Sequence, residues 1–568
     1  MVGNPLAGAP DRRKSRRTGR LAWLLLVAAC TKGVEPSITP CTAAGDSVTL
    51  TVDGYGFFDP VGAGCTVFPA TAGVAEYLVV PQLTAGNPGD QAPYRLGGDT
   101  ILPVTPSPTP QQLRALGRAE RFHRFLRLGD QRRWWGFAPE VGPQPSPPQP
   151  APQVGPPAYN ELRTFQVCAR LDCSRFDRVG ARAKAINSTV AIFVDTLAPP
   201  GGLDSVALDS IARVFDQRLY AIDTLAFGAE SDINADSVVM VLMTNTVNKL
   251  VPASECAAGF IAGFFLGIDI DPRFSTDSRS NKAEVFYSMV ADPAGTLSCP
   301  HSAAEVQAFV PVTFIHEFQH MISFNQHVLV RESNGELLWL NEGLSHYAEE
   351  LGGRSYELDP DARIANCTVN SLPCRFYGGN LSNAYDYLDS TTNHYLLPTE
   401  GIGSLAERGA QWLFVRYLLD RYAGTTRTEW NTFTRLMVMT NQVGAANVEA
   451  RTGDQFEDIV SRWGLANWVT DLGSAPAELK YDSWNMHAVY SSLHTQRANL
   501  FPNIYPLIPA LSAGRDVGLT GTLRSGSPIY HRATQAAGDP GFTLSFTAPN
   551  GALISAAMKP RLNVYRLQ

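Results

Sequence analysis

The amino-acid sequence predicts an α+β fold in which a large mixed domain is flanked by small β-domains. The chain has 568 residues, which is too many for one hydrophobic core, so we expect several domains. Short strand-like runs separated by Gly and Pro occur near both ends, for example at 47–52 and 542–546. The long middle part alternates strand-like and helix-like patterns, which predicts a mixed sheet followed by a helical subdomain.

The first thirty residues are typical of an export signal. Six Lys and Arg residues lie between positions 12 and 20, and the apolar run at 21–29 is too short to span a bilayer as a helix. The run ends Val27-Ala28-Ala29-Cys30, and small residues before a cysteine resemble the lipobox of bacterial lipoproteins. We therefore predict a lipoprotein-type signal peptide at 1–29 and a lipid on Cys30. The exported protein would then be a cell-envelope lipoprotein, at the outer membrane or cell surface. An ordinary signal peptide of a secreted protein is the alternative.

Charge and cysteine content narrow the function classes further. The formal net charge is −7 and becomes more negative once the basic N-terminus is removed, so we expect no nucleic-acid partner. Nine cysteines leave eight if Cys30 carries lipid, and an even number in an exported chain predicts disulfides. Many connectivities are open, and sequence spacing favours pairing between neighbours: 41–65, 168–173, 256–299 and 367–374.

Composition divides the chain into successive segments. An N-terminal β-domain is predicted at 30–105 and a C-terminal β-domain at 501–568, with the large domain at 161–500 between them. Residues 106–138 contain a basic amphipathic helix, and 139–160 form a stiff Pro-rich linker. We expect the helix to be a connector with a solvated arginine face, although a helix lying on a membrane surface has the same pattern.

Within the large domain, strands and helices can be assigned from hydrophobic periodicity. Strands are predicted at 188–194, 237–243 and 284–290, and helices at 203–227, 302–326, from about 340 onward, 404–422 and 453–472. The helix at 302–326 is apolar nearly all round, which indicates that it is buried.

This buried helix carries the sequence HEFQH. His316 and His320 stand at i and i+4, so both imidazoles project from one face, and neutral imidazole is a good zinc ligand. Glu317 follows the first histidine, which places its carboxylate beside a metal, where it can accept a proton from water. A bare HExxH pattern occurs by chance in roughly one chain in a hundred. The alternative is a pair of structural histidines, but the apolar flanks favour a metal site.

A catalytic zinc ion needs a third protein ligand and one open position. The helix that begins near position 340 contains NEGLSHYAEEL (341–351) and offers Glu342, which lies 22 positions after His320. That separation leaves room for a turn and a returning helix. His346 and His327 are competing ligand candidates.

The two motifs together resemble those of the gluzincin zinc peptidases, in which an Asn-Glu pair follows HExxH. They most resemble the hyicolysin-like family of bacterial secreted metallopeptidases. The resemblance covers about 170–475 and includes GAQWLF at 409–414 and FEDIVSRWGLANW at 456–468. It implies a zincin-type catalytic domain, with a mixed sheet and an active-site helix followed by a helical subdomain.

The resemblance also assigns residues. It implies that Zn²⁺ is bound by His316, His320 and Glu342, with Glu317 as the general base. An acidic side chain on the helix of the glutamate ligand should orient one ligand histidine. Glu349 is the best placed for this, because it lies seven positions after Glu342 on the same helix face.

The sequence departs from the aminopeptidase branch of this clan. The run AERGA at 406–410 has Ala406 where that branch has an oxyanion-stabilising tyrosine, and no GxMEN-type stretch is present. The resemblance therefore favours an endopeptidase. The oxyanion-stabilising residue is unassigned, with candidates Tyr385, Tyr387, His394 and Tyr395. Zincins bind an extended substrate along an edge strand, and chain order alone places that strand at 281–289.

We thus predict an exported, lipid-anchored zinc metalloendopeptidase. Its partners would be a peptide or protein substrate and a membrane contacted through the lipid on Cys30. The alternative from another class is a cell-surface binding protein or adhesin built on a catalytically inactive zincin. A zinc hydrolase that acts on a non-peptide amide is also compatible with the motif.

Overall fold

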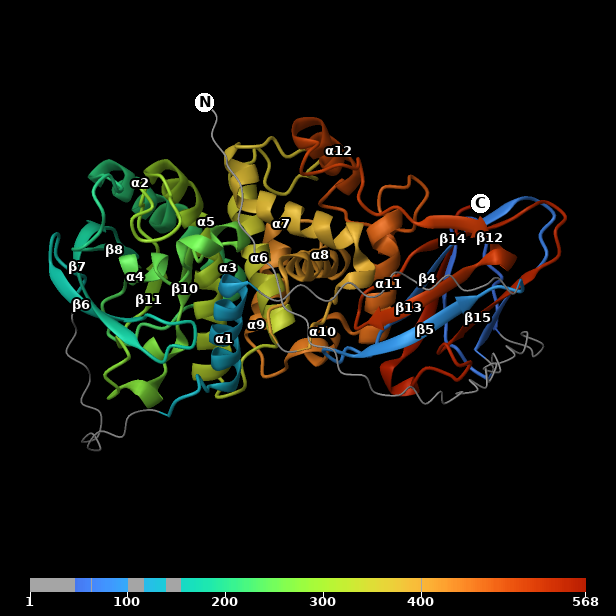
Figure 1. Cartoon of the computed structure of the whole chain (residues 1–568), viewed down its shortest axis with the longest axis horizontal. Helices are drawn as coiled ribbons and strands as arrows, with labels where there is room; N and C mark the ends of the chain where they lie inside the picture. Colours follow the sequence, from blue (N-terminus) through green and yellow to red (C-terminus); the bar gives the residue numbers. More distant parts are fainter. Residues whose placement is uncertain (1–45, 63, 101–116, 139–154, 400) are drawn as a thin grey trace, which may run out of the picture. The chain divides into compact units, whose positions relative to one another are not determined.

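Figure 1 shows the computed structural model of the chain, which describes residues 46–62, 64–100, 117–138, 155–399 and 401–568. The predicted signal peptide, Cys30, Cys41 and most of the Pro-rich linker lie outside these residues. The described part belongs to one compact unit, and none of its helices is long and apolar enough to cross a membrane. Helices and mixed sheets are combined in it, so the fold is α+β, as predicted.

A six-stranded mixed sheet forms the first part of the large domain, in the order β10-β11-β9-β8-β7-β6. Its central strands are parallel and buried, as their uninterrupted apolar runs require: β8 (Val190–Asp195), β9 (Val239–Met243) and β11 (Val285–Ser288). Antiparallel strands complete both sides: β10 (Gly263–Phe265) next to β11, and then β7 (Phe176–Ile186) and β6 (Leu162–Cys168) next to β8.

The edge strand on the β11 side of this sheet is β10, so the prediction that 281–289 forms the edge was wrong. That segment contains β11, which is paired with β10 on one side and with β9 on the other. β10 has only three residues, Gly-Phe-Phe. So short a run carries no periodicity from which a strand could be predicted.

The helix that carries HEFQH is α5 (Ala303–Phe324). It begins at a capping box, in which Ser302 Oγ accepts from Glu305 N and Glu305 Oε2 accepts from Ser302 N. The predicted helix 203–227 is instead two helices, α2 (Ser205–Val214) and α3 (Tyr220–Phe227), joined by a π-helical turn. Both α2 and α3 pack against α5.

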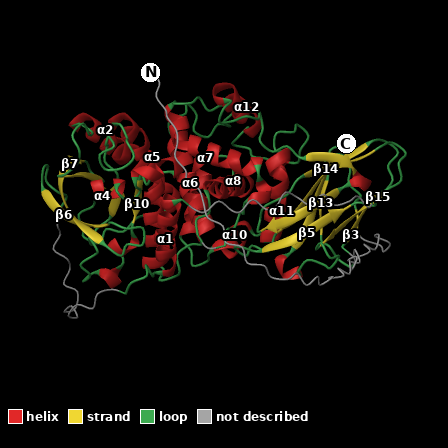
Figure 2. Cartoon of the chain, in the orientation of Figure 1, coloured by secondary structure: helices red, strands yellow, loops and turns green. Residues whose placement is uncertain are grey.

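A helical subdomain follows the sheet (Figure 2). At its centre is α6 (Leu338–Arg354), which is buried along its whole length. It packs against α5, α7 (Leu372–Asp389) and α8 (Leu405–Tyr422). The remaining helices are α9 (Arg427–Val438), α10 (Gly444–Thr452), α11 (Phe456–Val469) and α12 (Met486–Arg497).

The two β-rich ends of the chain share their sheets, so they do not form two separate β-domains as expected. One sheet has the order β1-β3-β15-β5-β13 and the other β12-β14-β4-β16-β2. Among these strands are β1 (Asp46–Ser47), β2 (Tyr55–Phe58), β3 (Cys65–Phe68), β12 (Ala510–Ala513) and β15 (Phe542–Thr547). Figure 1 shows β5 (Gln91–Gly97) beside β13 (Gly518–Arg524), although they come from opposite ends of the sequence. β4 (Ala75–Leu83) likewise lies between β14 (His531–Gln535) and β16 (Pro560–Arg566). The two sheets share one hydrophobic core. Each segment alone would leave strand edges unpaired, which explains why strands from both ends combine in the same sheets.

The basic helix is α1 (Arg118–Arg132), and its arginine face is not wholly solvated as expected. Arg127 is 1% exposed. Its Nη2 donates to Phe265 O (2.7 Å), and its Nη1 lies 3.2 Å from Asp130 Oδ2. Asp130 Oδ1 in turn accepts from Gly267 N (3.1 Å). α1 therefore contacts the β10 edge instead of acting only as a connector.

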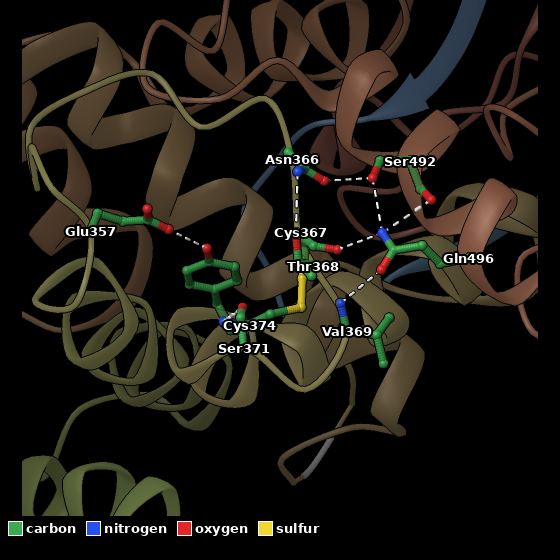
Figure 3. The surroundings of a disulfide bond; sticks show 10 residues. Glu357, Asn366, Cys367, Thr368, Val369, Ser371, Cys374, Ser492 and Gln496 are labelled. Carbon is green, nitrogen blue, oxygen red and sulfur yellow. Dashed lines mark hydrogen bonds between the residues drawn. A yellow bond between two sulfur atoms is a disulfide. The ribbon is translucent and has the colours of Figure 1, made fainter.

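Three of the predicted disulfides are present: Cys168–Cys173, Cys256–Cys299 and Cys367–Cys374. Cys65 is also disulfide-bonded, and its predicted partner lies outside the described residues. Figure 3 shows the third bridge. There the Gln496 side chain of α12 donates to Cys367 O (2.9 Å) and accepts from Val369 N (2.9 Å), so this amide ties the disulfide loop to α12.

Candidate metal centre

The structure brings His316, His320 and Glu342 together between α5 and α6. His316 Nε2 and His320 Nε2 are 3.2 Å apart. Glu342 Oε1 lies 3.4 Å from His320 Nε2, and Oε2 lies 3.8 Å from His316 Nε2. Ligands bound at about 2.1 Å in a tetrahedron are roughly 3.4 Å from one another. Both the spacing and the donor set therefore fit a zinc ion, and Glu342 Oε2 is a buried atom without a hydrogen-bond partner among the described residues.

Both histidines of this cluster are hydrogen-bonded through their other ring nitrogen. His316 Nδ1 donates to Glu349 Oε1 (2.7 Å), and His320 Nδ1 donates to Asn341 Oδ1 (3.2 Å). These bonds place the protons on Nδ1 and leave the Nε2 lone pairs directed at the centre. Glu349 thus lies within hydrogen-bond distance of His316, and its role in orienting a metal ligand stays a prediction. Asn341 was not singled out as a ligand partner, although it is the first residue of the Asn-Glu pair.

Burial and neighbouring charges shift the pKa values of these side chains in different directions. For His316, burial lowers the pKa, but the hydrogen bond to Glu349 outweighs it and the pKa is raised. Burial, reinforced by the charge of Arg127, lowers the pKa of His320 to about 3. For Glu349, burial opposes ionisation, but the charge of His346 and the hydrogen bond from His316 together lower its pKa to about 2. Burial likewise opposes ionisation of Glu342, yet the contact with His320 and the charge of Arg408 hold its pKa well below the usual range. His320 is therefore neutral while both carboxylates are ionised at neutral pH.

Glu317 lies beside the three ligands and points toward the β10 edge. It is 2% exposed, and its Oε2 accepts from Phe265 N (3.0 Å). Two side chains of α1 approach it. The Arg127 guanidinium has its Nη2 3.7 Å from Oε2, and His123, whose pKa is held well below the usual range by burial, has its Nδ1 3.8 Å from Oε1. Burial raises the pKa of Glu317, and Arg127 acts in the opposite direction. Sequence reasoning missed both α1 residues, because the basic pattern of that helix was assigned to solvent.

The two competing ligand candidates, His346 and His327, lie in different surroundings. His346 Nδ1 is 3.2 Å from Glu349 Oε2, so it shares this carboxylate with His316. A metal bound by His316, His346 and Glu349 would displace the 2.7 Å bond between His316 and Glu349. His327 is fully buried, with its Nε2 4.0 Å from Glu336 Oε2, and is not part of either cluster. The set with Glu342 is therefore preferred.

A cleft of about 580 Å³ runs between α1 and the start of α8. Its polar lining includes Glu120, His123, Asp386, His394, Glu407 and Arg408. His394 and Tyr395 line it, as two of the oxyanion candidates should. However, the hydroxyls of Tyr385, Tyr387 and Tyr395 are hydrogen-bonded to Asn503, Ser527 and Gln91. The hydroxyls of these three tyrosines are therefore already hydrogen-bonded to partners within the protein.

Comparison with known proteins points to the same class. No protein-family model matches the chain. A stretch of 194 residues is 28% identical to the neutral metalloprotease ShpI of Staphylococcus hyicus. The match covers 34% of this chain and spans 40% of the length of that relative. This likeness and the His/His/Glu cluster together support a metallopeptidase at the level of broad class.

Proposed function

We propose that this chain is a zinc metalloendopeptidase of the gluzincin type, similar to the hyicolysin-like family. The observation that carries the proposal is the convergence of His316 Nε2, His320 Nε2 and Glu342 at tetrahedral spacing, with Glu317 next to them. The likeness to a neutral metalloprotease supports a peptide or protein as the substrate. The motif at residues 12–30 supports export and a lipid anchor on Cys30.

When bound, zinc supplies Lewis-acid chemistry to the reaction. Glu317 accepts the proton of the attacking water and later delivers it to the leaving amine. Oε1 is the atom for this transfer, because Oε2 already accepts from Phe265 N and, among the described residues, Oε1 accepts no hydrogen bond. Glu349 and Asn341 hold the ligand rings in place through Nδ1.

The substrate reaches these groups through the cleft between α1 and α8. The outer edge of β10 is contacted by α1, which takes Phe265 O and Gly267 N as partners. The cleft is instead lined by side chains that flank the centre, including His123 and Arg408. The three proposed zinc ligands and the proposed base are all present. No observation on the described residues favours an inactive binding protein over an enzyme.

Metal content tests this proposal. We expect the purified protein to bind about one zinc per chain and to cleave casein until a chelator removes the metal. His320→Ala and Glu342→Ala should each lose both the zinc and the cleavage. His487→Ala, which alters a histidine on α12 outside the cluster, is the control and should keep both. A wild type without zinc, or a His320→Ala variant that retains a full equivalent, would overturn the assignment.

A further inference from the structure

Arg408 is a buried cation whose donors are not used. It lies in the first turns of α8 and is 8% exposed. Its side chain donates no hydrogen bond to any described residue, and its buried Nε has no partner there. The nearest acidic atom is Glu342 Oε2, which is 3.9 Å from Nε. A guanidinium carries five N–H donors, and buried donors without acceptors are unfavourable. Glu342 balances part of the charge, but none of the described residues accepts a hydrogen bond from this side chain, so this position calls for a further acceptor.

Close helix packing fixes Arg408 next to the candidate metal centre. A Cβ on Gly343, the residue after Glu342, would lie 2.8 Å from Gln411 O of α8. A Cβ on Gly409, the residue after Arg408, would lie 2.3 Å from Ala384 N of α7. Only glycine permits these backbones to approach so closely. The two glycines thus bring α8 against α6 and α7 and set Arg408 beside Glu342.

The acidic side chains around the cleft either already accept hydrogen bonds from the backbone or are exposed to solvent. Glu407 Oε2 accepts from Ser404 N and its Oε1 from Tyr395 N, so its carboxylate caps α8. Glu120 Oε2 accepts from Gly117 N and caps α1. Asp386 is solvent-exposed. Arg408 itself lines the cleft, so the acceptor for its N–H groups has to enter from the cleft.

We propose that Arg408 stabilises the oxyanion that forms when the scissile carbonyl is attacked. This inference rests on the proposed peptidase function. As the water oxygen bonds to the carbonyl carbon, one water proton passes to Glu317 Oε1 and the carbonyl π pair moves onto the carbonyl oxygen. Arg408 donates to that oxygen while it is negatively charged. When the C–N bond breaks, the C=O bond re-forms and the amine takes the proton from Glu317. Arg408 is thus a catalytic residue, and it fills the role left open by Ala406.

A positioning role for Arg408 on Glu342 predicts different measurements. A residue that only holds the ligand should change zinc affinity when it is replaced. An oxyanion donor should leave zinc binding and KM nearly unchanged and lower kcat, because its interaction forms only in the transition state. Removal of one such donor lowers kcat by about 10²–10³-fold. The binding of a peptide phosphonamidate, whose tetrahedral anion resembles the oxyanion, should weaken in parallel.

The experiment compares wild type, Arg408→Met, Arg408→Lys and the control Arg421→Met. Arg421 is an exposed arginine in the last turn of the same helix. Zinc stoichiometry, casein-peptide kinetics and phosphonamidate binding by calorimetry are measured on each. We expect Arg408→Met to keep zinc, to lose about 10²–10³-fold in kcat and to bind the phosphonamidate more weakly. Arg408→Lys should fall between it and the wild type, and it tests the role if the Met variant does not fold.

Two results would overturn this role. One is a zinc-loaded Arg408→Met enzyme with kcat and phosphonamidate affinity like those of the control. The other is a loss of zinc from Arg408→Met and Arg408→Lys at the concentrations where the control holds it, which would make Arg408 a positioning residue. Failure of the peptidase proposal itself looks different, because the wild type would then show no zinc-dependent casein cleavage and no phosphonamidate binding.

Discussion

Glu349 is the side chain on which the orientation of His316 depends. Its Oε1 accepts from His316 Nδ1 (2.7 Å), and its Oε2 lies 3.2 Å from His346 Nδ1. A carboxylate in this place makes a ligand imidazole more basic and fixes its ring. The amide of Glu349→Gln can still accept one hydrogen bond but carries no charge.

We therefore expect Glu349→Gln to bind zinc about 10- to 100-fold more weakly while still folding. Competition with a chromogenic chelator measures the affinity. The control is Glu332→Gln, which changes an exposed carboxylate outside the cluster. Equal affinities in the two variants would show that Glu349 does not support the metal.

A second residue, Glu336, makes stability depend on pH. Burial raises the pKa of its carboxyl from 4.5 to about 7, although hydrogen bonds from Gly444 N and Asn447 Nδ2 act in the opposite direction. The neighbouring His327 has a pKa lowered to about 4 by burial, so it is neutral in the same window. The folded state thus holds the Glu336 proton more tightly than the unfolded state does. This stabilisation is complete below about pH 4.5 and is lost as the pH rises through about 7.

The shift corresponds to a change on the order of 3 kcal/mol in unfolding free energy across this range. Glu336→Gln should remove that contribution, so its thermal midpoint should vary less between pH 5 and pH 7.5 than that of the wild type. Differential scanning calorimetry at the two pH values checks this. The same pH dependence in both proteins would mean that Glu336 is already ionised at pH 5.

Motif spacing supplied the four central residues but not their neighbours. His316, Glu317 and His320 follow from one helical turn, and Glu342 follows from the second motif. Arg408, His123 and Arg127 reach the same place from α8 and α1. Their positions depend on tertiary packing, which no local pattern encodes. For that reason the sequence left the oxyanion role open and assigned the arginines of α1 to solvent.

At the scale of elements, the close approach of α6 and α8 holds the site together. Gly343 lies where α6 meets Gln411 and Val415 of α8, and a Cβ there would lie 2.8 Å from an atom of each. One of these atoms is the backbone oxygen of Gln411, which a side-chain rotation cannot move. The helices would have to separate to admit even a methyl group.

Gly343→Ala should therefore destabilise the protein by about 1–3 kcal/mol through overpacking. The matched control is Gly379→Ala on α7, where an added Cβ meets nothing within 4 Å. Alanine is favoured over glycine by about 1 kcal/mol in a helix, so the control should be neutral or more stable. Urea denaturation of both variants measures the difference. A Gly343→Ala protein as stable as the control would show that the α6–α8 contact is not tight.

Element prediction succeeded where periodicity was long. The helices predicted at 302–326 and 404–422 match α5 and α8 closely. The helix predicted at 203–227 contains a π-helical turn at Phe215–Leu219, which shifts the periodicity without breaking it. The edge strand β10 escaped prediction because three residues carry no period.

At the scale of the whole molecule, the two ends of the chain depend on each other. β4 has both of its neighbours, β14 and β16, from the C-terminal segment, and β5 has β13 and β15. Sequence patterns identified strands in both segments. They could not show that these strands pair with one another, because pairing over more than 400 positions leaves no local signal.

Removal of residues 510–568 should consequently unfold the N-terminal strands. β4 and β5 lose both neighbours in this truncated chain, and their open edges become accessible. Limited proteolysis followed by mass spectrometry should find cleavage within 75–97 in the truncated protein and protection in the full chain. Continued protection of 75–97 would show that the N-terminal segment folds by itself, as two separate β-domains would require.

The central claim is that Glu317 is the base of a zinc peptidase, and the most direct test is zinc content and casein hydrolysis measured side by side on wild type and Glu317→Gln. Because Glu317 is not a ligand, both proteins should hold about one zinc per chain. Casein turnover should fall by about 10²–10⁴-fold in the variant. A folded, zinc-loaded Glu317→Gln protein that still cleaves casein at the wild-type rate would contradict the account.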